Sequence, residues 1–97
     1  MCDQRRHNES FIKKILEACQ RFESKEIPVI QLQRVIDDYG PLLEGVEQEV
    51  FEILQDFTSD LELIQHASIK EEHYERTCKV IEEIYSFFKE TFGDIEP

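Results

Sequence analysis

Four carboxylates lie at helical spacing in the middle of the chain. Glu49, Glu52, Asp56 and Asp60 are separated by three, four and four residues, and we call them the acidic ridge. On a helix they fall within an arc of about 80°, because each residue advances by about 100°. Carboxylates grouped in this way can bind lysine and arginine side chains of another protein. They act as general acid and base only where apolar surroundings separate their pKa values, and the sequence indicates none.

The ridge belongs to a longer acidic block. Between Val35 and Ala67 the sequence has no lysine or arginine and nine acidic residues: Asp37, Asp38, Glu44, Glu47, Glu49, Glu52, Asp56, Asp60 and Glu62. Residues 1–34 sum to +2 (seven minus five) and residues 68–97 to −4 (four minus eight), so the middle third supplies −9 of the total −11. A field of one sign attracts a basic partner and repels phosphates. The alternative is a solvated helix face without a partner.

The histidines are not spaced for metal binding or catalysis. None of the three has a glutamate three residues before it, the pattern of di-iron helix bundles. His66 and His73 are seven residues apart, and the predicted helix break at Ser68 separates them. No glycine-rich phosphate loop or nucleophile elbow is present. We therefore predict no catalytic residues, no metal and no cofactor, and a protein that is not an enzyme.

The cysteines and the apolar runs indicate the compartment. Cys2, Cys19 and Cys78 form no Cys-x-x-Cys pair, which predicts reduced thiols. No apolar run reaches the length of a membrane span, and the first residues lead into no apolar signal segment. We expect a cytoplasmic protein, whose net charge disfavours direct binding to nucleic acid or to an anionic membrane.

Four amphipathic helices account for the chain. Apolar residues at helical spacing predict helices from about residue 8 or 10 to 23, over 28–39, over 44–66 and from 68 to 92. The end signals are Pro28, Gly40-Pro41, a capping box from Ser68 to Glu71, and Gly93. No segment alternates apolar and polar residues as a strand would. We predict an all-α fold, an antiparallel four-helix bundle in a single domain over 1–97, with loose ends at about 1–8 and 94–97.

The apolar stripes of these helices predict the core. The expected core residues are Phe11, Ile12, Ile15, Ala18, Cys19 and Phe22; Leu32, Val35, Ile36 and Tyr39; Val46, Val50, Ile53, Leu54, Phe57, Leu61 and Ile64; and Tyr74, Cys78, Ile81, Ile84, Tyr85 and Phe88.

One apolar residue of the third helix lies outside its stripe. Leu63 falls on the same flank as the acidic ridge, where it could serve as an apolar anchor within a charged rim. The alternative is that Leu63 packs against a neighbouring helix. The predicted partner-binding residues are Glu49, Glu52, Asp56, Asp60 and Leu63, followed by Asp37 and Asp38.

Two segments carry a family resemblance. Residues 22–27 (FESKEI), at the end of the first helix, and residues 51–60 (FEILQDFTSD), on the third, resemble the colicin D-type immunity proteins and related immunity proteins of contact-dependent inhibition systems. The similarity covers about residues 10 to 90. The sequence departs from the family pattern after Glu62. There the usual acidic, proline-containing loop is replaced by a direct passage through His66-Ala67-Ser68 into the last helix.

The resemblance implies a function. In that family, small acidic helical proteins bind the nuclease domain of a toxin made by the same cell and cover its basic RNA-binding active site, with carboxylates in place of phosphates. We therefore expect an immunity protein that blocks a toxic RNase or tRNase, as a monomer in complex with the toxin rather than an obligate homodimer. The alternatives are a self-associating helical adaptor or regulator that pairs through Leu63, Val80 and Phe87, and a small enzyme or metal carrier that uses His66 or His73.

Overall fold

The chain folds into four α-helices. The structure, a computed structural model, describes residues 2–67, 69–93 and 95, with side chains from Arg6 onward. The elements are α1 (Cys2–Glu23), α2 (Val29–Tyr39), the short 3₁₀ helix η1 (Gly40–Leu42), α3 (Gln48–Ala67) and α4 (Lys70–Phe92). Within the described ranges the chain forms no strand.

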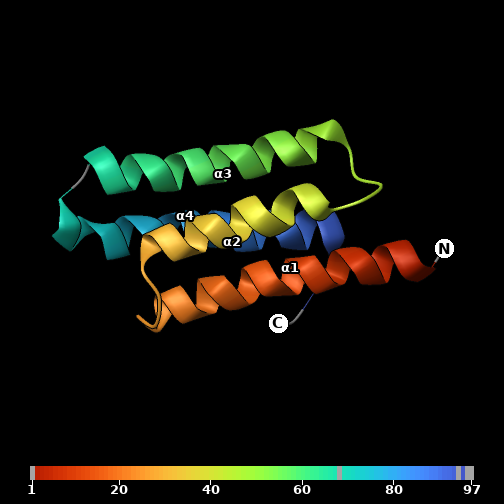
Figure 1. Cartoon of the computed structure of the whole chain (residues 1–97), viewed down its shortest axis with the longest axis horizontal. Helices are drawn as coiled ribbons and strands as arrows, with labels where there is room; N and C mark the ends of the chain where they lie inside the picture. Colours follow the sequence, from red (N-terminus) through yellow and green to blue (C-terminus); the bar gives the residue numbers. More distant parts are fainter. Residues whose placement is uncertain (1, 68, 94, 96–97) are drawn as a thin grey trace.

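Consecutive helices run antiparallel and pack side by side (Figure 1). α1 packs on α2, α2 on α3 and α3 on α4, and α4 returns to contact α1. Short connections favour this arrangement, because they place each helix beside the previous one. The predicted all-α antiparallel four-helix bundle is confirmed. In the part of the chain that the structure describes, no helix is long and apolar enough to cross a membrane.

The core follows the predicted stripes of all four helices. Its most deeply buried side chains are Ile12, Ile15 and Cys19 of α1, Leu32 and Ile36 of α2, Leu61 of α3, and Thr77, Ile81 and Ile84 of α4. Of the buried residues, Leu16, Thr77 and Val80 were not among the predicted core residues. Tyr74 was predicted to be buried, and it is instead 38 % exposed at the edge of the bundle.

The first helix begins earlier than predicted and includes residues 2–8, where we expected a loose end. α1 begins at Cys2, six residues before the earlier predicted start. His7 Nε2 lies 3.0 Å from the Leu42 carbonyl oxygen, and Asn8 bonds the backbone of Glu44. These contacts hold the first turns against the connection between α2 and α3, although these turns lack an apolar stripe.

The connection between α2 and α3 is longer than predicted. α2 ends at Tyr39 as expected, but Gly40 keeps helical angles and the chain continues as η1. Gly45 then adopts a left-handed φ of 69°, which interrupts the helical path. α3 consequently begins at Gln48, four residues after the predicted Glu44, so Glu44 and Glu47 lie in the connection.

Both ends of α4 depart in part from the prediction. Ser68, the first residue of the predicted capping box, lies outside the described residues, and the residue that precedes α4 is Ile69, without a side-chain cap. Gly93 ends α4 as predicted, with φ 84° and its N–H donating to the Lys89 carbonyl oxygen at 3.0 Å. In the predicted loose end, Asp94 and residues 96–97 lie outside the described residues, while Ile95 packs against the core.

Candidate functional site

The acidic ridge lies on the exposed surface of α3, and its two ends border α4. Glu49, Glu52, Asp56 and Asp60 are all exposed. Glu49, at one end, lines a cleft shared with the carboxyl end of α4. Asp60, at the other end, lines a groove shared with the first half of α4. The four carboxylates therefore form one row between two hollows of the α3/α4 face.

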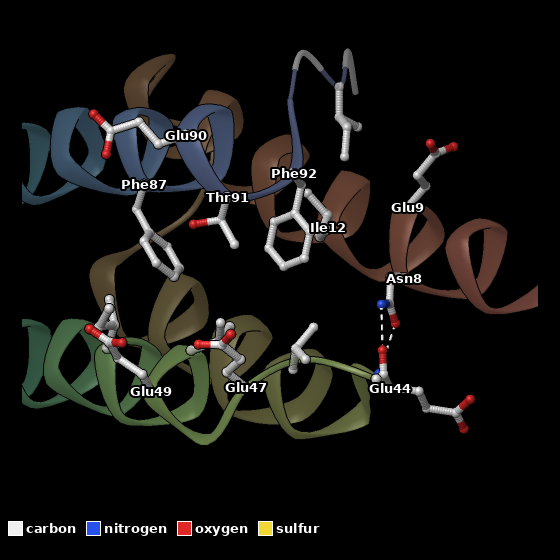
Figure 2. Close-up of a pocket in the computed structure, with 15 residues that line it drawn as sticks. Asn8, Glu9, Ile12, Glu44, Glu47, Glu49, Phe87, Glu90, Thr91 and Phe92 are labelled. Carbon is white, nitrogen blue, oxygen red and sulfur yellow. Dashed lines mark hydrogen bonds between the residues drawn. The ribbon is translucent and has the colours of Figure 1, made fainter.

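The hollow at the Glu49 end is the larger one, and we call it the α1/α3/α4 cleft. Its volume is about 770 Å³. Its described lining residues are Asn8, Glu9 and Ile12 of α1; Glu44, Gly45, Val46 and Glu47 of the connection; Glu49, Val50 and Ile53 of α3; Phe87, Glu90, Thr91 and Phe92 of α4; and Ile95. Figure 2 shows Phe87 and Phe92 projecting from α4 toward α3 across this space.

The cleft combines an apolar floor with an acidic rim. Val46, Ile53, Phe87, Phe92 and Ile95 are half-buried, so each packs on the core and still presents surface to the cleft. Five glutamates and no lysine, arginine or histidine occur among the described residues that line it. Two of the glutamates stand at the amino terminus of α3, where the helix dipole stabilises negative charge.

Asn8 fixes the edge of the cleft. Its side-chain Nδ2 donates to the Glu44 carbonyl oxygen at 2.7 Å, and its Oδ1 accepts from the Glu44 N–H at 2.8 Å (Figure 2). His7 Nε2 also lies 3.7 Å from the Glu44 carboxylate. The two Asn8 hydrogen bonds tie α1 to the connection that leads into α3, so the acidic edge is held in place by the fold.

The hollow at the Asp60 end carries charges of both signs, and we call it the far groove. It encloses about 570 Å³ and is lined by Asp60, Leu63 and Ile64 of α3 and by Glu72, Glu75, Arg76, Lys79 and Val80 of α4. Arg76 pairs with Glu72 at 3.3 Å. The ridge therefore meets two basic residues at this end, which α4 supplies and which the acidic block of the sequence did not reveal.

Leu63 lies free of the core. It is 62 % exposed and lines the far groove beside α4. The predicted apolar flank for self-association is incomplete. Val80 is only 8 % exposed, and Phe87 is half-buried with its ring 5.8 Å from that of Phe57. Of the three residues proposed to pair with a second copy, only Leu63 is fully available.

Asp37 and Asp38 lie on a different face from the ridge. Both are exposed on α2, and Asp37 lines a smaller hollow of about 290 Å³ that includes Thr58 of α3. Partial desolvation there, and then the carboxylates of Asp38 and Glu62, raise the pKa of Asp37, while the nearby Thr58 hydroxyl acts in the opposite direction. The structure therefore does not bring these two residues together with the acidic ridge.

A polar cluster that sequence reasoning missed joins α1 to α4. The Tyr85 hydroxyl donates to the Glu23 carboxylate at 2.7 Å, and the Tyr74 hydroxyl donates to the Glu23 carbonyl oxygen at 2.6 Å. Burial, and then the charge of Glu23, raise the pKa of the Cys19 thiol to about 12. Such a thiol is protonated and unreactive at neutral pH, so this cluster has a structural role.

The two histidines considered for metal binding or catalysis lie on different helices. His66 is exposed near the end of α3, whereas His73 is half-buried on α4. Among the described residues, no group of three or more histidine, cysteine, aspartate or glutamate side chains is placed to hold a metal ion.

No family model, curated protein or solved structure matches this chain. The likeness to colicin D-type immunity proteins therefore depends on the two segments quoted above.

Proposed function

We propose that this chain is an immunity protein that binds the basic active site of a toxic RNase and blocks it. The observation that carries the proposal is the α3/α4 face, where four exposed carboxylates run in one row from a cleft lined by five glutamates toward the exposed Leu63. An RNase active site needs lysine and arginine to hold a polyanion. A row of carboxylates fixed on a helix competes for the same cations.

The charge distribution supports fast recognition. The net charge of −11 is concentrated in the segment that includes the ridge. Complementary fields of this kind raise association rates to about 10⁸–10⁹ M⁻¹s⁻¹ at low salt, and the rate falls as salt screens the charges. The proposed complex contains one copy of each protein and forms in the cytoplasm, before the toxin can reach its RNA.

The apolar part of the surface supports a single binding partner of opposite charge rather than a second copy. Two copies that each carry −11 repel one another. With Val80 buried, the flank proposed for self-association retains only Leu63 as a fully exposed residue. On the ridge flank, Leu63 instead provides an isolated apolar contact beside Asp60, as in interfaces whose few anchors lie within a polar rim.

The test begins with the genes that flank the one for this chain, among which the proposal predicts a gene for a toxin with a cationic nuclease domain. Co-expression should restore growth to cells that make the nuclease, and purified protein should abolish RNA cleavage at one equivalent. Light scattering should give the mass of a one-to-one complex. RNA cleavage that continues in the presence of a tenfold excess of this chain would contradict the proposal.

A further inference from the structure

We infer that the α1/α3/α4 cleft is the docking site for a cationic amphipathic segment of the protein partner, one that places apolar side chains on the cleft floor and lysine or arginine on its rim. This inference deepens the proposed function, on which its choice of partner rests. It is carried by the shape, the exposed apolar surface and the charge of the cleft, to which the acidic ridge contributes only Glu49.

The size of the cleft indicates a segment rather than one side chain. Pockets that bury a drug-sized ligand enclose about 300–1,000 Å³, and the cleft, with about 770 Å³, lies inside that range. Several side chains from one turn or strand of a partner can enter it together.

The apolar side chains on the floor of the cleft are only partly covered by the fold, so a partner can contact them. Phe87 packs one side of its ring against Phe57 and Phe88, yet it remains half-buried. Phe92 contacts Phe88 with its ring, and it lines the same cleft as Phe87 (Figure 2). Half-buried aromatic rings in a concave site can bind the apolar anchor residues of a partner.

The rim determines the charge of the occupant. Glu90 of α4 lies on one side of the opening, and Glu47 and Glu49 of the α3 side lie on the other (Figure 2). Within the described residues these three glutamates make no ion pair. A segment with apolar residues alone would leave the carboxylates without partners beside a desolvated interface, whereas flanking lysine or arginine residues would pair with them.

The cleft edge is organised before any partner binds. The two hydrogen bonds of Asn8 fix the backbone of Glu44, three residues before Glu47. A docking site held in this way avoids part of the ordering cost of binding.

The direct test compares two synthetic peptides by NMR titration of the isotope-labelled protein. One peptide alternates leucine and phenylalanine with lysine and arginine. The other has the same charge, with serine and glycine in place of the apolar residues. We expect the amphipathic peptide to shift the amide signals of Val46, Ile53 and Thr91 and to bind more tightly than the polar one.

Matched variants separate the cleft from general attraction. The test variant, E47Q/E90Q, neutralises one carboxylate on each side of the rim. The control, E17Q/E82Q, removes the same charge from exposed glutamates of α1 and α4 that line none of the hollows described above. We expect the test variant to bind the amphipathic peptide about fivefold more weakly, and the control to change affinity by less than about twofold. A Thr91→Trp variant, which fills the cleft without removing charge, should weaken binding as well.

Several results would overturn the inference: signals that shift only around the far groove, equal affinity for the two peptides, or equal behaviour of the test and control variants. The toxin assay distinguishes this failure from failure of the proposed function. If E47Q/E90Q and Thr91→Trp inhibit the nuclease like the unmodified protein, the cleft inference fails and the immunity function stands. If the peptide binds in the cleft but the nuclease is not inhibited, the docking site stands and the immunity function fails.

Discussion

The two ends of the α3/α4 face each have a hollow, and the hollows differ in charge balance. The α1/α3/α4 cleft has five glutamates and no base among its described lining residues, whereas the far groove contains Arg76 and Lys79 beside its acids. The ridge on α3 contributes one carboxylate to each hollow, so the difference comes from Glu9, Glu44 and Glu47 at the cleft and from Arg76 and Lys79 at the far groove. Because a basic partner is attracted more strongly to the cleft end than to the far end, the fold gives the ridge a direction as well as a charge. A partner is therefore oriented along α3, not merely attracted to it.

Both ends depend on the same core, and the largest expected effect tests that dependence. Leu54→Ala and Phe57→Ala should each lower the free energy of unfolding by about 2–5 kcal/mol, because both side chains are buried and leave a cavity. Chemical denaturation measures the loss. Phe57 contacts Phe87 of the cleft, so Phe57→Ala should also disturb the cleft floor. Losses below about 0.5 kcal/mol for both variants would show that Leu54 and Phe57 do not pack in the core.

The next largest effect is that of Asn8→Ala, which should change the cleft end and leave the far groove unchanged. Asn8→Ala removes both hydrogen bonds to Glu44 and should lower the free energy of unfolding by about 1 kcal/mol. Amide exchange should accelerate over residues 43–47 and remain unchanged around the far groove. Equal acceleration at both ends would mean that Asn8 supports the whole bundle and not the cleft edge.

The smallest stability effect concerns Asp37, which belongs to neither end. Its pKa is raised in the folded state above the usual 3.8, so the ionised form opposes folding. The stability that Asp37 contributes is complete below pH 3.8 and is lost as the pH rises through the raised value. Asp37→Asn should therefore raise the melting temperature at pH 7 by about 1–2 °C.

The control for that change is pH itself. The gain from Asp37→Asn should shrink toward zero as the pH falls through the raised pKa of Asp37, because the aspartic acid is then neutral too. A gain that is the same at pH 4 and at pH 7 would show that the carboxylate charge is not its cause.

The periodic parts of this protein were predictable from sequence. Apolar spacing predicted four helices and most of the core because residues such as Ile12, Leu32, Leu61 and Ile84 recur at the helical period. The starts of α1 and α3 were less predictable. The first turns of α1, from Cys2, lack an apolar stripe, and the left-handed φ of 69° at Gly45 moves the start of α3 from the predicted Glu44 to Gln48.

The cleft could not be predicted, because three separate segments form it. Asn8, Glu47 and Glu90 are far apart in the sequence, and only the packing of α1 and α4 around the start of α3 brings them together. The bases of the far groove were missed for the same reason, since Arg76 and Lys79 lie outside the acidic block. The ridge itself was predictable because its four residues share one helix face.

The acidic ridge is the central claim, and binding of the cognate nuclease tests it most directly. The test variant is E49Q/E52Q/D56N/D60N. The control, E17Q/E62Q/E71Q/E82Q, neutralises four exposed acids elsewhere, including Glu62 on the α2 side of α3, so both variants change the net charge from −11 to −7 (−11 plus four). Calorimetry at two salt concentrations measures the affinity of each for the nuclease, and thermal melting confirms that each is folded. We expect the test variant to lose about 2 kcal/mol or more of binding free energy with a weaker salt dependence, and the control to lose less than about 0.5 kcal/mol. Equal losses in the two folded variants, or undiminished affinity of the test variant, would contradict the claim that the ridge is the binding surface.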